Sequence, residues 1–391
     1  MPKSIQRSPR SALILIVIAQ FLGTSLWFAG NAAIPEMSKL LGQPELTAAI
    51  TSSVQLGFIL GTLVFALLSI PDRFPPNRVF LLSAIAAAIF NCLVTFIPIQ
   101  LEAVLLCRFL VGFFLAGIYP VGMKIAADYF QKGLGAALGL LVGALVLGTA
   151  FPHLIRALDW QLSWQIIFWI TSFLATIGGV LVGLWVPDGP YRRANPKFDW
   201  KVLPQLSKIR SLKSAASGYF GHMWELYTFW AFLPALVSYF TLKPSISSSN
   251  GLISFAIIGA GAASCALGGF LAARIGSAKV AKFSLIGSGA CCLLLLFIPS
   301  DPSWGWIFFL LIWGMLVTAD SPQFSTLVAQ ATPAEYKGTA LTLVNCLGFS
   351  LTIFSIYLSQ WLLQWIPITQ VLALLLGGPL LGILLFQKFR N

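Results

Sequence analysis

The sequence predicts an all-α membrane protein with twelve transmembrane helices in two six-helix bundles. Of the 391 residues, 58% are hydrophobic and only 9% are charged, against about 25% charged residues in an ordinary soluble domain. A membrane-spanning helix needs about 20 mostly apolar residues. Apolar runs of that length lie near 11–34, 46–70, 79–97, 101–127, 134–155, 166–186, 214–240, 249–273, 280–298, 304–327, 340–361 and 368–386.

The first run follows Lys3, Arg7 and Arg10, and basic residues before an apolar run are also typical of a secretory signal peptide. This run is too long for a signal peptide, and many further runs follow it. We therefore expect it to be the first transmembrane span.

Basic residues gather on the side of the spans that holds both termini. The other side has Lys39, Arg156 and Lys243 as its basic residues, together with acidic residues such as Glu36 and Glu45. Because cytoplasmic loops collect lysine and arginine, both termini are predicted to be cytoplasmic. The net charge of +12 is then a topology signal, also suited to anionic lipid headgroups, and it does not indicate a nucleic-acid partner.

The cysteines and loops limit the remaining options. All six cysteines fall within apolar spans, without the spacing of a disulfide framework or a zinc site. No metal or cofactor is therefore expected. Loops are short and no Asn-x-Ser/Thr acceptor occurs, which favours a bacterial inner-membrane protein, expected as a monomer.

Residues 187–213 form a basic linker that divides the chain into bundles 1–186 and 214–391. The loop after span two reads Asp72-Arg73-Phe74-Pro75-Pro76-Asn77-Arg78, and the loop after span eight reads Ala273-Arg274-Ile275-Gly276-Ser277-Ala278-Lys279. Lys132-Gly133 before span five likewise matches Lys337-Gly338 before span eleven. Internal duplication of a six-span unit is the architecture of many secondary transporters.

These residues resemble the major facilitator superfamily. The stretch 268–279, GGFLAARIGSAK, is similar to the family's Gly-x-Leu-Ala-Asp-Arg-x-Gly-x-x-Lys/Arg loop, with Ala273 in place of Asp. Arg108 and Gly112 match its Arg-x-x-x-Gly pattern in span four. The resemblance implies its fold of two six-helix bundles and transport by alternating access.

The resemblance also implies a cytoplasmic latch. Its residues from the two loops are Asp72, Arg73, Arg78, Arg274 and Lys279. Lys124 and Asp128 lie four residues apart near the end of span four, which puts them on one helical face, and we assign both to this latch.

A second family motif, Gly-x-x-x-Gly-Pro of antiporters, is only half matched in span five. Gly139 and Gly143 are present, but Ala144 replaces the proline. Close helix packing is the simpler interpretation of these glycines.

Glu225 is the first candidate for proton coupling. It lies eleven residues after Ser214, or roughly 16 Å into span seven, in the aromatic sequence GHMWELYTFWAF. Charges at this depth are costly, and desolvation makes reversible protonation of a carboxylate feasible. His222 precedes it by three positions on the same face. A structural hydrogen bond between helices is the alternative.

Asp320 and Arg108 complete this candidate set. Asp320 begins Asp-Ser-Pro in span ten, where Pro322 leaves a carbonyl without its helical partner, as in the interrupted helices of transporter sites. Capping of the restarted helix is the alternative role. Arg108 in span four can hold an anionic substrate or take part in proton coupling, and pairing with a neighbouring helix explains it equally well.

A central substrate cavity is the second predicted site. Its candidates are polar or aromatic: Gln20, Trp27, Asn31, Tyr119, Tyr227 and Trp230. Aromatic residues in membrane proteins more often pack or anchor at the interface, so that interpretation stays open.

The sequence thus favours a proton-coupled secondary transporter of a small organic solute, with an anion as one option, and not an enzyme. A proton antiporter that exports lipophilic drugs and a non-transporting sensor of the same fold are the alternatives. The chain has no Gly-x-x-x-x-Gly-Lys-Ser/Thr loop, so direct ATP coupling is unsupported. Small molecules, protons and membrane lipids are the expected partners.

Overall fold

The computed structural model describes residues 8–130, 134–158, 163–192, 198–241, 248–298 and 305–390. Several charged residues used for the predicted topology or repeat, among them Lys132, lie outside these ranges. The regular secondary structure of the described part is helical. Its helices are α1 (Pro9–Thr24), α2 (Ala29–Ala32), α3 (Ile34–Leu41), α4 (Thr47–Leu67), α5 (Ile70–Arg73), α6 (Pro76–Leu93), α7 (Leu101–Leu115), α8 (Tyr119–Tyr129), α9 (Leu134–Leu158), α10 (Trp164–Trp185), α11 (Leu203–Leu206), α12 (Arg210–Thr241), α13 (Ser248–Ile275), α14 (Ser277–Leu294), α15 (Gly305–Ala319), α16 (Ser321–Ala331), α17 (Lys337–Leu362), α18 (Ile368–Ala373) and α19 (Gly377–Arg390).

Within the described ranges, 10 helices, counting joined segments as one, are long and apolar enough to cross a membrane. The other two predicted spans are also helical. The first is divided, with 16 residues in α1 before a break. The seventh is α12, which has 32 residues, so its composition and not its length keeps it out of the ten. His222 and Glu225 are among the residues that lower its hydropathy.

Several predicted spans contain interruptions, and three of them bear on the site. α7 gives way to α8 at Tyr119 and α15 gives way to α16 at Ser321, each with a proline at the start of the second helix. Proline lacks an amide hydrogen and suits a first helical turn, so Pro120 and Pro322 explain where these helices restart. The break between α1 and α2 contains no proline and has another cause, given below.

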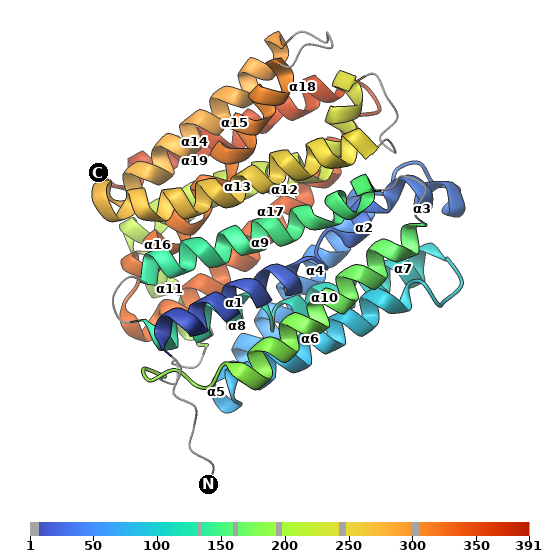
Figure 1. Cartoon of the computed structure of the whole chain (residues 1–391). Helices are drawn as coiled ribbons and strands as arrows, with labels where there is room; N and C mark the ends of the chain where they lie inside the picture. The colour runs from blue at the N-terminus through green and yellow to red at the C-terminus, as the bar shows by residue number, and fades with distance from the viewer. Residues whose placement is uncertain are drawn as a thin grey trace.

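Helices α1–α10 lie together in the lower part of the molecule in Figure 1, and α12–α19 lie together above them. α9 packs along α13, and α4 packs along α17, so two pairs of helices join the halves. A Cβ atom on Gly143 would lie 2.9 Å from the carbonyl oxygen of Ala262, and one on Gly139 would lie 3.2 Å from that of Cys265. These glycines let α9 approach α13 closely, which supplies the packing role considered for them.

α1 begins and α19 ends at the same end of the helices, at the left in Figure 1. We call this end the terminal face, which the basic residues predict to be cytoplasmic. The opposite end, where α3 and α18 lie, is called the distal face.

Candidate functional site

A cavity of about 660 Å³ lies between the two halves. It opens at the terminal face, because its lining includes the end of α8 and the starts of α9 and α17. Both halves contribute side chains to its inner part. These include Tyr119, Met123, Leu138, Val142, Val146, Tyr219, Met223, Tyr227, Trp230 and Phe349.

Charged residues in the cavity lining are confined to its mouth. They are Lys124, Asp128 and Lys337, which lie at the end of α8 and the start of α17. The inner lining is aromatic and aliphatic, with the hydroxyl groups of Tyr119, Tyr227 and others as its polar atoms. The inner cavity therefore offers stacking surfaces and hydrogen bonds without a formal charge.

Aromatic rings close the cavity toward the distal face. Trp27, in the break between α1 and α2, stacks on Tyr227 and on Phe349, each with ring centroids 5.8 Å apart. Phe28 meets Trp230 edge-on at 6.2 Å. These contacts run between the N-terminal and C-terminal halves, so they separate the cavity from the distal face.

Hydrogen bonds strengthen this closure at the distal ends of α4 and α17. The Gln360 side-chain oxygen accepts from the amide of Ala48 at 2.7 Å, and its nitrogen donates to the carbonyl of Glu45 at 3.1 Å. The first amides of a helix have no partner within it. Gln360 thus caps α4 from the opposite half.

The predicted proton-coupling residues divide into separate groups. Nδ1 of His222 lies 2.8 Å from Oδ1 of Asp320, and both side chains are buried. Asp320 stands between α15 and α16, with cavity-lining Thr318 and Ser321 on either side of it in the chain. The pair is therefore directly behind the cavity wall.

Glu225 faces the interior of the C-terminal half. Its Oε2 accepts from the Ser288 hydroxyl at 2.8 Å, and its Oε1 accepts from Nε1 of Trp313 at 2.6 Å. The Cys292 thiol donates at 3.4 Å. Glu225 is fully buried and does not line the central cavity.

The hydrogen bonds of Glu225 can accommodate two protonation states. The Ser288 hydroxyl also lies 3.2 Å from the carbonyl of Leu285. When Glu225 is ionised, Ser288 can donate to it; when Glu225 is protonated, it can donate to Ser288, which then donates to Leu285. Neither state leaves the carboxyl group without partners, which suits a group that gains and loses a proton.

Arg108 lies within the N-terminal half and does not line the cavity. It donates to Oδ1 of Asn91 at 2.6 Å and to the carbonyl oxygens of Leu26 and Trp27 at 2.7 and 3.1 Å. The last two carbonyls belong to the break between α1 and α2, so Arg108 satisfies the backbone where the helix stops. This explains a break without proline and ties Arg108 to the position of Trp27.

The structure separates the six predicted cavity residues. Tyr119, Tyr227 and Trp230 line the cavity, whereas Gln20, Trp27 and Asn31 lie outside its lining. Trp27 belongs to the aromatic closure. Asn31 donates to the Thr51 hydroxyl at 2.7 Å.

Gln20 is fully buried. Its amide has no hydrogen-bond partner among the residues that the structure describes.

Among the predicted latch residues, Asp72 and Lys124 form an ion pair of 2.8 Å within the N-terminal half. Asp128 is buried at the end of α8, where its carbonyl accepts from the Tyr191 amide at 3.0 Å. The remaining basic residues of the predicted latch are exposed at the terminal face. They are Arg73, Arg78, Arg274 and Lys279.

Sequence reasoning did not single out several residues of this arrangement. Ser288, Trp313 and Asn91 are polar side chains inside apolar spans, and that placement alone could have marked them as partners of Glu225 and Arg108. Gln360 lies near the end of a span, where polar residues are ordinary, and had no such signal.

Two helical halves around a cavity that is open to one face and closed to the other are an arrangement typical of secondary transporters. A family model described as Major Facilitator Superfamily matches residues 16–356. The chain therefore belongs to the Major Facilitator Superfamily. Membership makes it an integral membrane protein and a secondary transporter, not an enzyme.

Two known proteins show the extent of the similarity. The crystal structure of the human organic anion transporter MFSD10 (TETRAN) superposes with a TM-score of 0.72 at 15% identity, covering 98% of this chain and 100% of that one. This likeness concerns the fold, including its twelve spans. The Ascochitine biosynthesis cluster MFS transporter of Didymella fabae is 29% identical over 173 residues, or 42% of this chain and 32% of the relative. A fungal relative does not support the bacterial inner membrane expected from the loops.

Proposed function

We propose that the protein couples proton movement to the transport of a small organic solute. The observation that carries this proposal is the buried pair of His222 and Asp320 immediately behind the cavity wall. A buried pair with no net charge is far less costly than one with a lone negative charge. Loss of one proton converts the neutral pair into a pair with a net negative charge. Because water stabilises that charge, the protonation of the pair can depend on how well the cavity is hydrated.

Glu225 is proposed as the second proton-holding group. It lies one helical turn from His222 on α12, and its partners allow both protonation states. An ionised Glu225 would have only neutral donors, and a nearby negative charge on Asp320 would oppose it further. The protonation of Glu225 is therefore coupled to that of Asp320. Asp320 is the carboxyl group nearer to the solute.

The inner cavity favours an uncharged or weakly basic, lipophilic solute with aromatic rings. Tyr119, Tyr227, Trp230 and Phe349 provide ring faces and hydroxyl groups, while the lining contains no charge at this depth. This supports the drug-export alternative over an anionic solute, because Arg108 already donates to three oxygen atoms outside the cavity. Transport of organic anions is a property of the human transporter, and it does not extend to this chain because 15% identity carries the fold alone.

A measurement of flux is needed to separate transport from ligand binding alone, which is what a sensor of the same fold would show. Transport requires that the cavity change sides, whereas a sensor needs only to bind. The test begins with thermal stabilisation of the purified protein by a set of aromatic amines, neutral lipophilic compounds and organic acids. The solute that stabilises it most is then added to proteoliposomes that contain a pH-sensitive dye.

A proton-coupled transporter will change the luminal pH when that solute is added, and protein-free vesicles will not. Binding without solute flux would identify a sensor and reject the proposal. Flux without any pH change would retain transport but reject proton coupling.

A further inference from the structure

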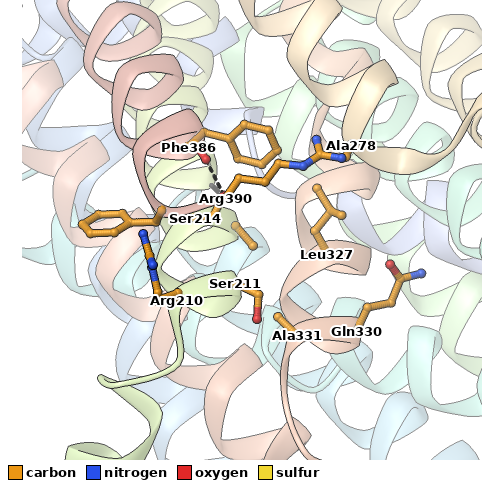
Figure 2. A pocket seen from close by; sticks show the side chains of 11 residues that line it. Arg210, Ser211, Ser214, Ala278, Leu327, Gln330, Ala331, Phe386 and Arg390 are labelled. Atoms are coloured by element: carbon orange, nitrogen blue, oxygen red, sulfur yellow. Dashed lines mark hydrogen bonds between the residues drawn. The ribbon is translucent and has the colours of Figure 1, made fainter.

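A second pocket, of about 480 Å³, opens at the terminal face of the C-terminal half. It lies among the ends of α12, α14, α16 and α19 and is separate from the central cavity, with which it shares only Gln330. Figure 2 shows Arg390 reaching across the pocket towards Ala278, with Arg210 on the opposite side beside Ser211. This volume is in the range of small-molecule sites.

The pocket is positively charged. Arg210 and Arg390 belong to its lining, and among the residues that the structure describes no carboxylate does. Within the described ranges, neither arginine forms an ion pair with a carboxylate. Arginine offers a fork of donors that matches the oxygen atoms of a phosphate group. Ser211 and Gln330 provide further polar groups at the same opening.

The surroundings of the pocket are apolar and face lipid. Phe386, Phe389 and Leu327 also line it. Along the same helices, large apolar side chains point outward, with Leu381 of α19 61% exposed and Phe283 of α14 66% exposed. Outward apolar faces of this kind contact the hydrocarbon layer in a membrane protein. The arginines thus stand where lipid-facing helices reach the headgroup level.

We propose that this pocket binds the phosphate of an anionic lipid headgroup, held between Arg210 and Arg390. A free phosphate ester offers the same chemistry, but the adjoining apolar faces of α14 and α19 favour a ligand with acyl chains. Ser214 donates to the Phe386 carbonyl at 2.6 Å and joins α12 to α19 at the pocket wall. The bound headgroup would then connect these helices to α16, which lines both the pocket and the central cavity.

The proposal is tested by native mass spectrometry of the full-length protein in a neutral detergent, titrated with phosphatidylglycerol. Each basic residue near a membrane surface contributes about a fivefold change in affinity for anionic lipid, so Arg210→Gln and Arg390→Gln should each weaken binding about fivefold. Arg274→Gln is the matched control, because Arg274 is exposed at the same face but does not line the pocket. Phosphatidylcholine and glycerol 3-phosphate are titrated in parallel.

Selective binding of phosphatidylglycerol that is about fivefold weaker in each of the two pocket variants and unchanged in Arg274→Gln would support the proposal. Equal binding by the double variant and the wild-type protein would overturn it. Equal binding of phosphatidylcholine would overturn the role of the anionic charge, and glycerol 3-phosphate binding as tightly as the lipid would overturn the lipid as the source. A thermal unfolding scan of each variant shows whether it remains folded.

Discussion

Gln360 should influence the fraction of protein molecules that are closed at the distal face. Its side chain joins α17 to α4 through the amide of Ala48 and the carbonyl of Glu45. These bonds can form only while the two halves meet at that face. Gln360→Ala should therefore raise the free energy of the distally closed state without changing the interior of either half.

The size of the effect follows from the exposure of the two bonds. A protein hydrogen bond contributes about 0.5–1.5 kcal/mol net. The bond to Ala48 is partly buried, whereas the bond to Glu45 is exposed. Their joint loss should cost about 1–2 kcal/mol, which corresponds to a shift of about 5-fold to 30-fold between the closed and open states.

Spin labels placed at Gln43 and Trp365, both exposed at the distal face, can report this shift as a second, longer distance in electron resonance measurements. Gln364→Ala is the matched control, since Gln364 is exposed and its side-chain nitrogen donates to the exposed Glu45 carboxylate at 3.2 Å. Its effect should be about twofold or less. A distance distribution in Gln360→Ala identical to that of the wild-type protein would refute the assignment of Gln360 to this closure.

Three further predictions concern the halves and their contacts. Arg108→Leu leaves the buried acceptors on Asn91 and Trp27 without donors and leaves the Leu26 carbonyl with only the 3.4 Å bond from the Ala29 amide, so it should lower stability by about 3 kcal/mol or more; an unchanged thermal midpoint, compared with the exposed Arg78→Leu, would contradict this. Gly143→Ala should force α9 from α13 and lower stability by about 1–3 kcal/mol, whereas Gly135→Ala should be tolerated because its Cβ would meet nothing within 4 Å. If Asp72 and Lys124 belong to a latch, Asp72→Asn should increase maleimide labelling of a cysteine introduced at Leu138 from the terminal face; unchanged labelling would remove Asp72 from the latch.

The sequence was sufficient for the fold because each of its cues is local. Apolar runs mark spans, Pro322 marks where an interrupted helix restarts, and the two copies of the basic loop indicate the duplication. The break after α1 has no local cue, since its cause is Arg108 on a different helix.

The site was harder to derive because side-chain partners depend on how helices are rotated against each other. His222 and Glu225 share a helical face by spacing, yet His222 contacts Asp320 while Glu225 contacts α14 and α15. The depth of a residue along a span can be counted from the sequence. Whether it faces the cavity or the interior of one half requires the positions of neighbouring helices.

Proton coupling through the buried carboxyl groups is the central claim, and it is tested most directly with Asp320→Asn and Glu225→Gln in proteoliposomes. Each amide approximates the protonated form, so both variants should still exchange labelled solute across the membrane. Neither should accumulate solute when a pH gradient is the sole driving force. Ser325 also lies at the cavity wall but has no ionisable group. Ser325→Ala is therefore the control that should accumulate solute normally. Accumulation driven by the pH gradient in the Asp320→Asn, Glu225→Gln double variant would contradict the account.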